Sequence, residues 1–499
     1  MKWKKLMAVC LTLSVVLAGC GKTEPTTAQT AGAETQTQES VSEETKETEP
    51  EMAASDETVG EDAEAAVTGD KQVVVYFANW YLGEKAADQG AEVASIPWDK
   101  VTYINHAFWG VVPADGTTET SVERRASGEG ARTEFKIVST APDKDYEDTT
   151  PSDMRPDIAR NHFAEYAAYS EQYPDVNIMI SIGGWTACGY FSEMAYTEEG
   201  RQSFIRSCLD LMDQYEWIDG IDIDWEYPGG SKDGERAPES DNDQGCPIFG
   251  TSKEDNVNFA TLLSELRDAM DEHFGEGAKK LTACASASTS WTLPMQDWAS
   301  FAPYLDLINV MTYDLAGVWD ATTGHASSAW SAKSAASYFK GLGIELDKVC
   351  IGSPMYATAL LMKEIPASGN VVGAAIEDYK PNETEIDETK LRAFEEEALS
   401  GFSVKQDGKA WVMGDFFEEE GTGWHFAYDE KKNACYMYND CEDSPYYKWY
   451  ISYENHLSLQ AKLDYINEKD LAGIIVWECS EDTYDHEFIS QMADNLIAE

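Results

Sequence analysis

The chain has 499 residues, of which 43% are hydrophobic and 11% aromatic, so it can form one large domain with an insertion, or two or three domains. Its formal net charge is −54 at pH 7. A polyanion repels nucleic acids and anionic membrane surfaces, which argues against both as binding partners and favours a neutral or cationic substrate.

The first 20 residues have the pattern of an export signal. Three lysines among the first five residues precede an apolar run that ends at Cys20 and is short for a membrane span. This end resembles the lipobox of bacterial lipoproteins, which implies a signal peptide over residues 1–19 and lipidation of Cys20. The alternative is an ordinary signal peptide cut near Ala18 or Gly19. We expect an exported protein, anchored by its lipid to the bacterial cell surface or released from it.

Residues 20–70 lack the side chains that form a core. The stretch is rich in Thr, Glu, Ala and Gln, and from Lys22 to Asp70 it contains no Trp, Tyr, Phe, Ile or Leu. Such a composition cannot bury enough apolar surface to offset the entropy of folding, and its like charges repel one another. We expect an acidic, disordered tether.

From residue 71 onward, short apolar runs alternate with helical patterns, as repeated βα units require. The candidate strands are residues 73–77, 101–108, 176–182, 220–225, 281–287, 307–311, 349–354 and 472–477. Between the fourth and fifth strands, residues 256–272 place their apolar side chains at helical spacing. Eight such units predict an α/β fold, a closed (β/α)8 TIM barrel over residues 71–499, whose active residues lie at the C-terminal ends of the strands.

One interval interrupts this alternation. Roughly a hundred residues separate the seventh strand from a helix that begins near Leu457, too many for a simple loop. Short strand patterns occur at residues 370–374, 410–416 and 423–428. They predict a small α+β insertion, approximately residues 357–450, that forms one wall of a cleft.

The stretch from Asp219 to Glu226 places four carboxylates in eight residues of an otherwise apolar run. Side chains alternate along a strand, so Asp222, Asp224 and Glu226 point the same way, about 6.6 Å apart from one to the next. Like charges at that spacing raise at least one pKa, and a carboxylic acid that stays protonated near neutral pH suits acid catalysis of glycoside cleavage. Glu226 ends the series, where the strand meets its loop.

Several motifs follow one another in order along the chain. They are Asp219-x-x-Asp222-x-Asp224-x-Glu226, Ser181-Ile182-Gly183-Gly184-Trp185, Met311-Thr312-Tyr313-Asp314, Gly352-Ser353-Pro354-Met355-Tyr356 and Trp477-Glu478. Together they resemble glycoside hydrolase family 18, the chitinase family, over residues 71–496. The acidic signature is specific by itself, and the order of the whole set leaves little room for coincidence.

The resemblance implies a retaining mechanism without an enzymic nucleophile. Glu226 would protonate the glycosidic oxygen, and the substrate's own N-acetyl carbonyl would attack to give an oxazolinium-type intermediate. Asp224 would turn toward Glu226 and orient the acetamido N–H, while Asp222 would share a proton with Asp224. Tyr313 would donate a hydrogen bond to the attacking acetamido carbonyl.

The resemblance also implies the residues around the sugar. Trp477 would form the floor on which the distorted sugar stacks. The other expected substrate-binding residues are Asp314, Met311, Tyr227, Trp185 and Tyr356. For Asp219, whose strand parity is opposite, and for Gly183 and Gly184 we expect structural roles.

One position departs from the family pattern. Many relatives follow the seventh-strand Tyr with a small residue and an Arg that reaches the active site, whereas Tyr356 is followed by Ala357 and Thr358. Asp314 therefore lacks the expected cationic partner. Either another cation compensates or the subsite prefers a different sugar.

The leading interpretation is a chitinase that cleaves β-1,4-linked N-acetylglucosamine polymers. The same machinery would serve an endo-β-N-acetylglucosaminidase acting on N-glycans or peptidoglycan-like glycans. A non-catalytic glycan-binding lipoprotein is the alternative from another class, which the presence of Glu226 opposes. We expect a monomer, no cofactor, and contact with a membrane only through the lipid anchor.

Eight cysteines follow the predicted lipidation site, and their spacing matches no zinc or Cys-x-x-Cys pattern. We therefore expect no metal site. Oxidation of some pairs is open for an exported protein, and Cys435 with Cys441 would close a small loop. Cys284 and Cys350 lie in apolar runs and are expected to be buried thiols.

Overall fold

The computed structural model describes residues 71–80, 92–152, 155–230, 246–317, 319–377, 423–444, 446–483 and 485–497. The predicted signal peptide, Cys20, the tether and the strand pattern at residues 410–416 lie outside the described residues. Within the described ranges, no helix combines the length and the apolar character needed to cross a membrane.

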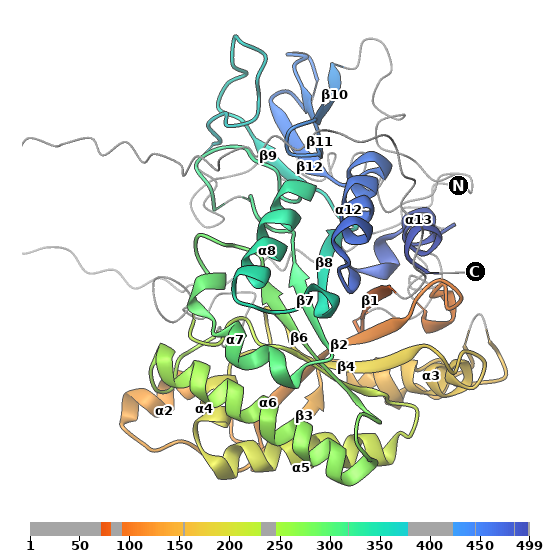
Figure 1. The fold of residues 1–499 in the computed structure, drawn as a ribbon, viewed down its shortest axis with the longest axis vertical. Coiled ribbons are helices and arrows are strands. Elements are labelled where there is room, and N and C mark those ends of the chain that lie inside the picture. The colour runs from red at the N-terminus through yellow and green to blue at the C-terminus, as the bar shows by residue number, and fades with distance from the viewer. Residues whose placement is uncertain are drawn as a thin grey trace, which may run out of the picture. The chain divides into compact units, whose positions relative to one another are not determined.

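Eight parallel strands form a closed barrel, which confirms the predicted fold (Figure 1). The ring closes because β1 pairs with β13 on one side and with β2 on the other. The barrel strands are β1 (Gln72–Ala78), β2 (Tyr103–Pro113), β4 (Asn177–Gly183), β5 (Gly220–Asp224), β6 (Lys280–Ser286), β7 (Leu307–Met311), β8 (Val349–Pro354) and β13 (Gly473–Trp477). Each of the eight predicted strands corresponds to one of them.

The second strand is longer than predicted and leaves the barrel. Its distal part, Trp109 to Pro113, pairs antiparallel with β3 (Phe135–Ser139), which adds a ninth strand at the edge of the ring. A register shift between Ala107 and Trp109 marks the point where β2 turns away from β4. The sequence did not predict this hairpin, because its turn lies within a long loop.

Helices surround the barrel (Figure 1). They are α2 (Ser121–Ser127), α3 (His162–Ser170), α4 (Phe191–Tyr196), α5 (Glu198–Gln214), α6 (Ser252–Phe274), α7 (Trp298–Phe301), α8 (Ala329–Gly341), α12 (His456–Lys469) and α13 (Glu487–Leu496). The helix predicted over residues 256–272 is α6, which begins earlier because Thr251 caps it by accepting a hydrogen bond from the Glu254 backbone. Single turns include η1 (Val93–Ser95), η2 (Asp143–Glu147), η3 (Leu293–Met295), η4 (Ala302–Tyr304), η5 (Leu346–Lys348) and η7 (Cys479–Glu481).

Two hydrophobic layers hold the barrel. The larger one fills the space between the strands and the helices, and alternate strand residues such as Ile221 and Ile223 point into it. The smaller one lies inside the ring and includes Tyr76, Met179 and Cys284. Because the faces of β5 alternate, Asp222 and Asp224 share the inner side with this second layer.

A four-stranded antiparallel sheet lies in the chain between β8 and α12. Its order is β10 (Trp424–Asp429), β11 (Ala434–Asn439), β12 (Trp449–Tyr453) and β9 (Thr358–Leu361). The strand pattern at residues 423–428 corresponds to β10. The strand predicted at residues 370–374 is wrong: the segment forms a turn in which Gly373 has a left-handed φ of 85°. The boundaries of an insertion at 357–450 remain a prediction, since residues 378–422 are outside the described ranges.

The cysteines of the described residues carry free thiols. Cys284 and Cys350 are buried, as predicted. Cys435 does not pair with Cys441, because its thiol points into the core of the small sheet and donates a hydrogen bond to Asn455 Oδ1 at 2.7 Å.

Candidate active site

Strand β5 is held in register by the glycines that precede Trp185. Gly183 lies opposite Asp224 and has a φ of 118°, and a Cβ there would lie 2.1 Å from the Asp224 carbonyl oxygen. Gly184 N–H donates a hydrogen bond of 2.8 Å to that same oxygen. Only glycine allows this approach, so the Gly183-Gly184 pair fixes the end of the acidic strand.

Asp222 is fully buried at the centre of the barrel. Its Oδ2 accepts hydrogen bonds from Tyr76 Oη at 3.0 Å and Ser181 Oγ at 2.7 Å, and its Oδ1 accepts from Thr282 Oγ1 and from Asn309 Nδ2 at 3.2 Å. Burial raises the pKa of Asp222, and these donors oppose that rise. Both oxygens are occupied by neutral donors, and no hydrogen bond joins Asp222 to Asp224 among the described groups. The expected proton sharing between the two carboxyls stays a prediction.

Asp224 is a buried carboxyl in a strongly perturbed environment. It is 3% exposed, and its Oδ1 is buried without a hydrogen-bond partner among the described groups. Burial raises the pKa of Asp224 well above its ordinary value, and the charges of Glu226 and then Asp222 raise it further. This carboxyl can therefore carry a proton near neutral pH and offers an unused oxygen to a ligand.

Glu226 follows directly after β5 at the C-terminal end of the barrel. Its side chain is mostly buried, and its backbone N–H donates to Cys188 Sγ at 3.2 Å. Tyr227 lies beside it: burial, and then the Glu226 charge, raise the pKa of Tyr227 well above its usual range. Glu226 thus lies at the C-terminal end of the barrel strands, with its main chain held by Cys188.

Tyr313 follows β7 on the other side of the ring. It is 7% exposed, and Gly352 is required behind it, because a Cβ there would lie 2.6 Å from the Tyr313 ring. Burial raises the pKa of Tyr313, and the charges of Cys284, Asp224, Asp314 and Glu226 raise it further. The phenol therefore remains protonated. It can form hydrogen bonds with a ligand but does not act as a charged group.

Aromatic rings form one wall of the site. Trp477, at the end of β13, stacks on Phe108 with ring centroids 5.3 Å apart and an interplanar angle of 14°. The rings of Tyr76 and Trp80 lie beside the same indole, with centroids 5.7 and 6.1 Å from its centroid. Phe108 and Trp80 were not predicted as neighbours of Trp477, because they come from β2 and from the loop after β1.

Asp314 lacks a cationic partner within the described part of the chain. Its Oδ1 accepts a hydrogen bond of 2.6 Å from Tyr356 Oη, and Thr358, where relatives carry Arg, begins β9 and pairs with Ser452. Desolvation raises the pKa of Asp314, and the Tyr356 hydrogen bond opposes the rise. The alternatives of another compensating cation and of a different sugar preference both stay predictions.

The remaining predicted residues lie at different depths. Met311 ends β7 and, like Trp477, packs against the inner layer, whereas Trp185 is 41% exposed beyond β4. Asp219 lies at the opposite end of β5 from Glu226, where its Oδ2 accepts a hydrogen bond of 2.9 Å from Ile178 N–H. Met311 is thus near the expected sugar site, Trp185 faces solvent, and Asp219 links neighbouring strands.

Sequence reasoning missed the groups that hold Asp222: Tyr76, Ser181, Thr282 and Asn309. They lie on four different strands, and they come within hydrogen-bond distance of Asp222 only when the ring closes. The available signal was a polar residue at an inward position of an otherwise apolar strand, as Asn309 is in β7.

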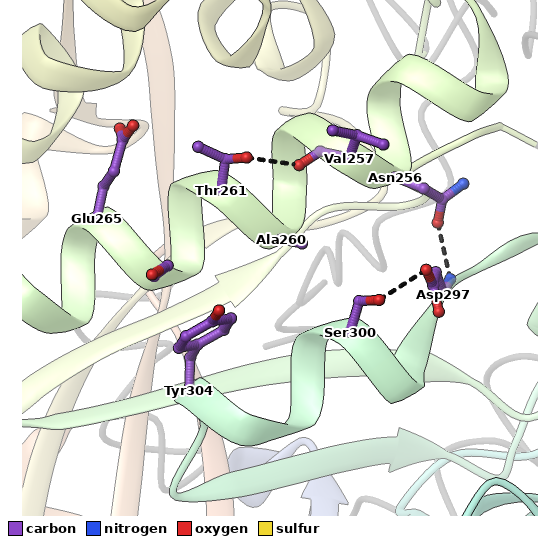
Figure 2. Close-up of a pocket in the computed structure, with 9 residues that line it drawn as sticks. Asn256, Val257, Ala260, Thr261, Glu265, Asp297, Ser300 and Tyr304 are labelled. Carbon is purple, nitrogen blue, oxygen red and sulfur yellow. Dashed lines mark hydrogen bonds between the residues drawn. The ribbon is translucent and has the colours of Figure 1, made fainter.

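A surface hollow of about 360 Å³ lies away from these residues, between α6 and the α7–η4 segment (Figure 2). Within it, Ser300 Oγ donates to Asp297 Oδ2, and Asp297 N–H donates to Asn256 Oδ1. It contains none of the predicted site residues.

Comparisons with known proteins agree with the motifs. The protein-family profile described as Glycosyl hydrolases family 18 matches residues 72–482. Chitinase A of Pseudoalteromonas piscicida is 26% identical over 453 residues, covering 85% of this chain and 52% of the relative. Chitinase A1 of Niallia circulans is 27% identical over 456 residues, covering 84% and 58%. The chain thus spans little more than half the length of these curated relatives.

Among solved structures, the Group IV chitinase of Ostrinia furnacalis in complex with allosamidin superposes with a TM-score of 0.61. The two sequences are 22% identical, and the match covers 86% of this chain and 100% of that one. At this identity the likeness supports the fold.

Proposed function

Because the chain belongs to the glycosyl hydrolases of family 18, we propose that it hydrolyses β-1,4-linked N-acetylglucosamine polymers with retention of configuration. The observation that carries the proposal is the state of Asp224, which is buried next to Glu226 with one carboxylate oxygen free of hydrogen bonds from described groups. A bound acetamido N–H would satisfy that oxygen. This makes a 2-acetamido sugar a better fit than an unsubstituted one.

Each proposed step uses a group in this barrel. Glu226 donates its proton to the glycosidic oxygen as the bond to the leaving sugar breaks, and the acetamido oxygen bonds to the anomeric carbon. Asp224 accepts the acetamido N–H and stabilises the positive charge that develops on the ring. Tyr313 donates to the acetamido oxygen and fixes its line of approach. Glu226 then takes a proton from water, whose oxygen opens the oxazolinium ring with overall retention.

Asp222 acts from behind Asp224. Its hydroxyl, amide and thiol donors keep it in place. The Asp222–Asp224 pair can gain or lose one proton, so that Asp224 is neutral in the free enzyme and charged when the ring nitrogen becomes positive. Trp477 presents its indole face to the apolar face of the sugar, and the stacked Phe108 holds that indole in one orientation.

The first experiment tests the acid. Glu226→Gln should abolish release of a reporter from chitobiose and chitotriose glycosides and leave oligosaccharide binding largely intact, because the amide keeps the shape but cannot protonate. Glu198→Gln, on the exposed first turn of α5, is the matched control and should retain full turnover. Unchanged turnover in Glu226→Gln would refute the assignment.

The second experiment tests substrate assistance and substrate class. An acetamido-thiazoline, which mimics the oxazolinium intermediate, should inhibit the enzyme, and Asp224→Asn should lower its turnover. Product profiles on chitin oligomers and on a high-mannose glycoprotein, run in parallel, separate a chitinase from an endo-β-N-acetylglucosaminidase. Cleavage of the glycoprotein alone would replace the proposed substrate with N-glycans.

We further propose, from the lipobox-like sequence, that the enzyme is exported and anchored through Cys20. Labelled palmitate should be incorporated into the chain in its bacterial host, and Cys20→Ala should abolish the label and release the enzyme from the membrane fraction. Label retained by Cys20→Ala would contradict the proposed anchor.

A further inference from the structure

A second cluster of chemically active side chains lies outside the barrel interior. His106 of β2, Asp145 of η2 and His162 of α3 are each fully buried, and one potential ligand atom from each lies within 4.8 Å of the others. Asp145 Oδ1 lies 2.9 Å from His106 Nε2 and 3.0 Å from His162 Nδ1. Three separate elements thus bring two imidazole nitrogens to one carboxylate oxygen, within metal-binding distance of one another.

Two atoms of this cluster that face away from its centre, Asp145 Oδ2 and His106 Nδ1, contact other groups. Asp145 Oδ2 accepts hydrogen bonds from Ser139 Oγ at 2.5 Å and Asn79 Nδ2 at 3.3 Å. His106 Nδ1 lies 3.3 Å from Tyr166 Oη. Ligating histidines and carboxylates in metal sites are oriented in this way, by hydrogen bonds to the atoms that do not face the metal.

The charge of the cluster is incomplete without a cation. Asp145 contacts Asn79, Ser139 and the two histidines, and no Lys or Arg of the described residues pairs with it. A fully buried carboxylate without a compensating charge is costly. Either an imidazolium or a metal ion must supply that charge.

The geometry points to a divalent metal: we propose that His106, Asp145 and His162 bind a zinc-class ion. Two imidazole nitrogens and one carboxylate oxygen match the preference of zinc, whereas calcium and magnesium prefer all-oxygen sites. Tetrahedral zinc with ligand bonds of about 2.0–2.1 Å places its ligand atoms about 3.3 Å apart. The two spacings from Asp145 Oδ1 to the imidazole nitrogens, 2.9 and 3.0 Å, would widen by a few tenths of an ångström, and the third spacing, between the two nitrogens, is within 4.8 Å.

The position assigns the metal a structural role. His106 faces away from the barrel interior, and the bound ion would tie η2 and α3 to β2 in the absence of any disulfide there. Asn79 couples the cluster to the aromatic wall, since its amide also donates to the carbonyl oxygen of Phe108, the residue stacked on Trp477. Metal binding should therefore stabilise the fold more than it alters the chemical step.

No pattern in the sequence indicated this site. The ligands are separated by 39 and 17 residues, which matches no zinc motif. The proposal does not depend on the proposed glycosidase activity.

The test measures metal content and metal-dependent stability of the full chain, produced without an affinity tag in zinc-replete and zinc-depleted media. Elemental analysis after dialysis should find about one zinc per chain from replete medium, and the zinc-depleted protein should melt at a lower temperature. His106→Gln keeps an N–H donor toward Asp145 but removes a strong ligand. It should lose the zinc, and its melting temperature should not depend on the medium.

His273→Gln is the control, because it removes an exposed imidazole that pairs with Asp213 on the surface, and it should retain the zinc. Substoichiometric metal in the parent chain, with the same melting temperature from both media, would overturn the proposal and leave an imidazolium network in its place. If His106→Gln does not fold, the zinc content and the melting temperature of the parent chain from the two media still test the proposal.

Discussion

Replacing Tyr313 with Phe separates catalysis from folding more cleanly than any other change at the site. The Tyr313 hydroxyl makes no hydrogen bond with a described group, and the ring is held by burial and by its edge contact with Tyr356, whose centroid is 6.3 Å away. Phe keeps those contacts. The free energy of unfolding should therefore change by less than about 0.5 kcal/mol.

The effect on turnover should be much larger. The hydroxyl is proposed to donate to the acetamido oxygen as charge develops on it, and loss of one such donor typically costs about 2.7–4 kcal/mol, or about 10²–10³ in kcat. Because the raised pKa of Tyr313 keeps the phenol protonated, the defect should persist across the pH range of activity. KM should change little if the bond strengthens mainly in the transition state.

The assay compares kcat on a chitobiose reporter with urea denaturation of the same preparation. Tyr356→Phe is the matched control, since it removes a hydroxyl that donates to Asp314 from the same wall, and it should cost far less in kcat. A kcat for Tyr313→Phe within about tenfold of the parent enzyme would refute the role assigned to the hydroxyl.

Three further changes test the framework around the site. Gly183→Ala should destabilise the protein by at least about 1–3 kcal/mol, because its left-handed φ and the Asp224 carbonyl oxygen exclude a Cβ. Asp255 is buried, and burial raises its pKa to about 7, so the folded state keeps a proton that the unfolded chain loses above about pH 4. The free energy of unfolding should therefore fall by up to about 4 kcal/mol as the pH rises from about 4 to about 7. Asp255→Asn should remove that part of the fall. Lys462→Met should cost about 3–5 kcal/mol, because it leaves its buried partner Glu454 without a compensating charge.

Urea denaturation measures all three. Gly110→Ala is the control for the glycine, since a Cβ there meets its nearest atom at an ordinary 3.7 Å, and equal losses at both positions would contradict the close-approach argument. For Asp255, the unfolding free energy is compared near pH 5 and pH 8, and an unchanged slope in the variant would count against the assigned pKa. The double change Lys462→Met with Glu454→Gln should be less costly than Lys462→Met alone, and a greater loss would contradict the ion-pair reasoning.

Local patterns were sufficient for the barrel and for the order of its strands. Each apolar run that alternates with a helical stretch must be buried on both faces, and eight of them in order leave few alternatives to a closed ring. The same patterns were weaker in the small sheet. Residues 370–374 satisfied a strand pattern, yet Gly373 turns the chain there, because partner strands and not local preference decide such short elements.

The arrangement of the acidic strand was also predicted from the sequence. Its spacing alone placed Asp222 and Asp224 on one side of β5 and Glu226 at its end, since alternation along a strand is a local property of the backbone. The motif order then supplied Tyr313 and Trp477 from strands far away in the chain. What the sequence determined by itself was thus the fold and the strand ends on which the expected site residues lie.

The tertiary structure decided which contacts those groups make. Closure of the ring brings Tyr76 and Asn309 to Asp222, leaves Asp224 with an oxygen unused by described donors, and places Phe108 beneath Trp477. It also assembles His106 with two ligands from other elements. These outcomes depend on distances between residues remote in sequence, and such distances are fixed only when the strands pair and the helices pack against them.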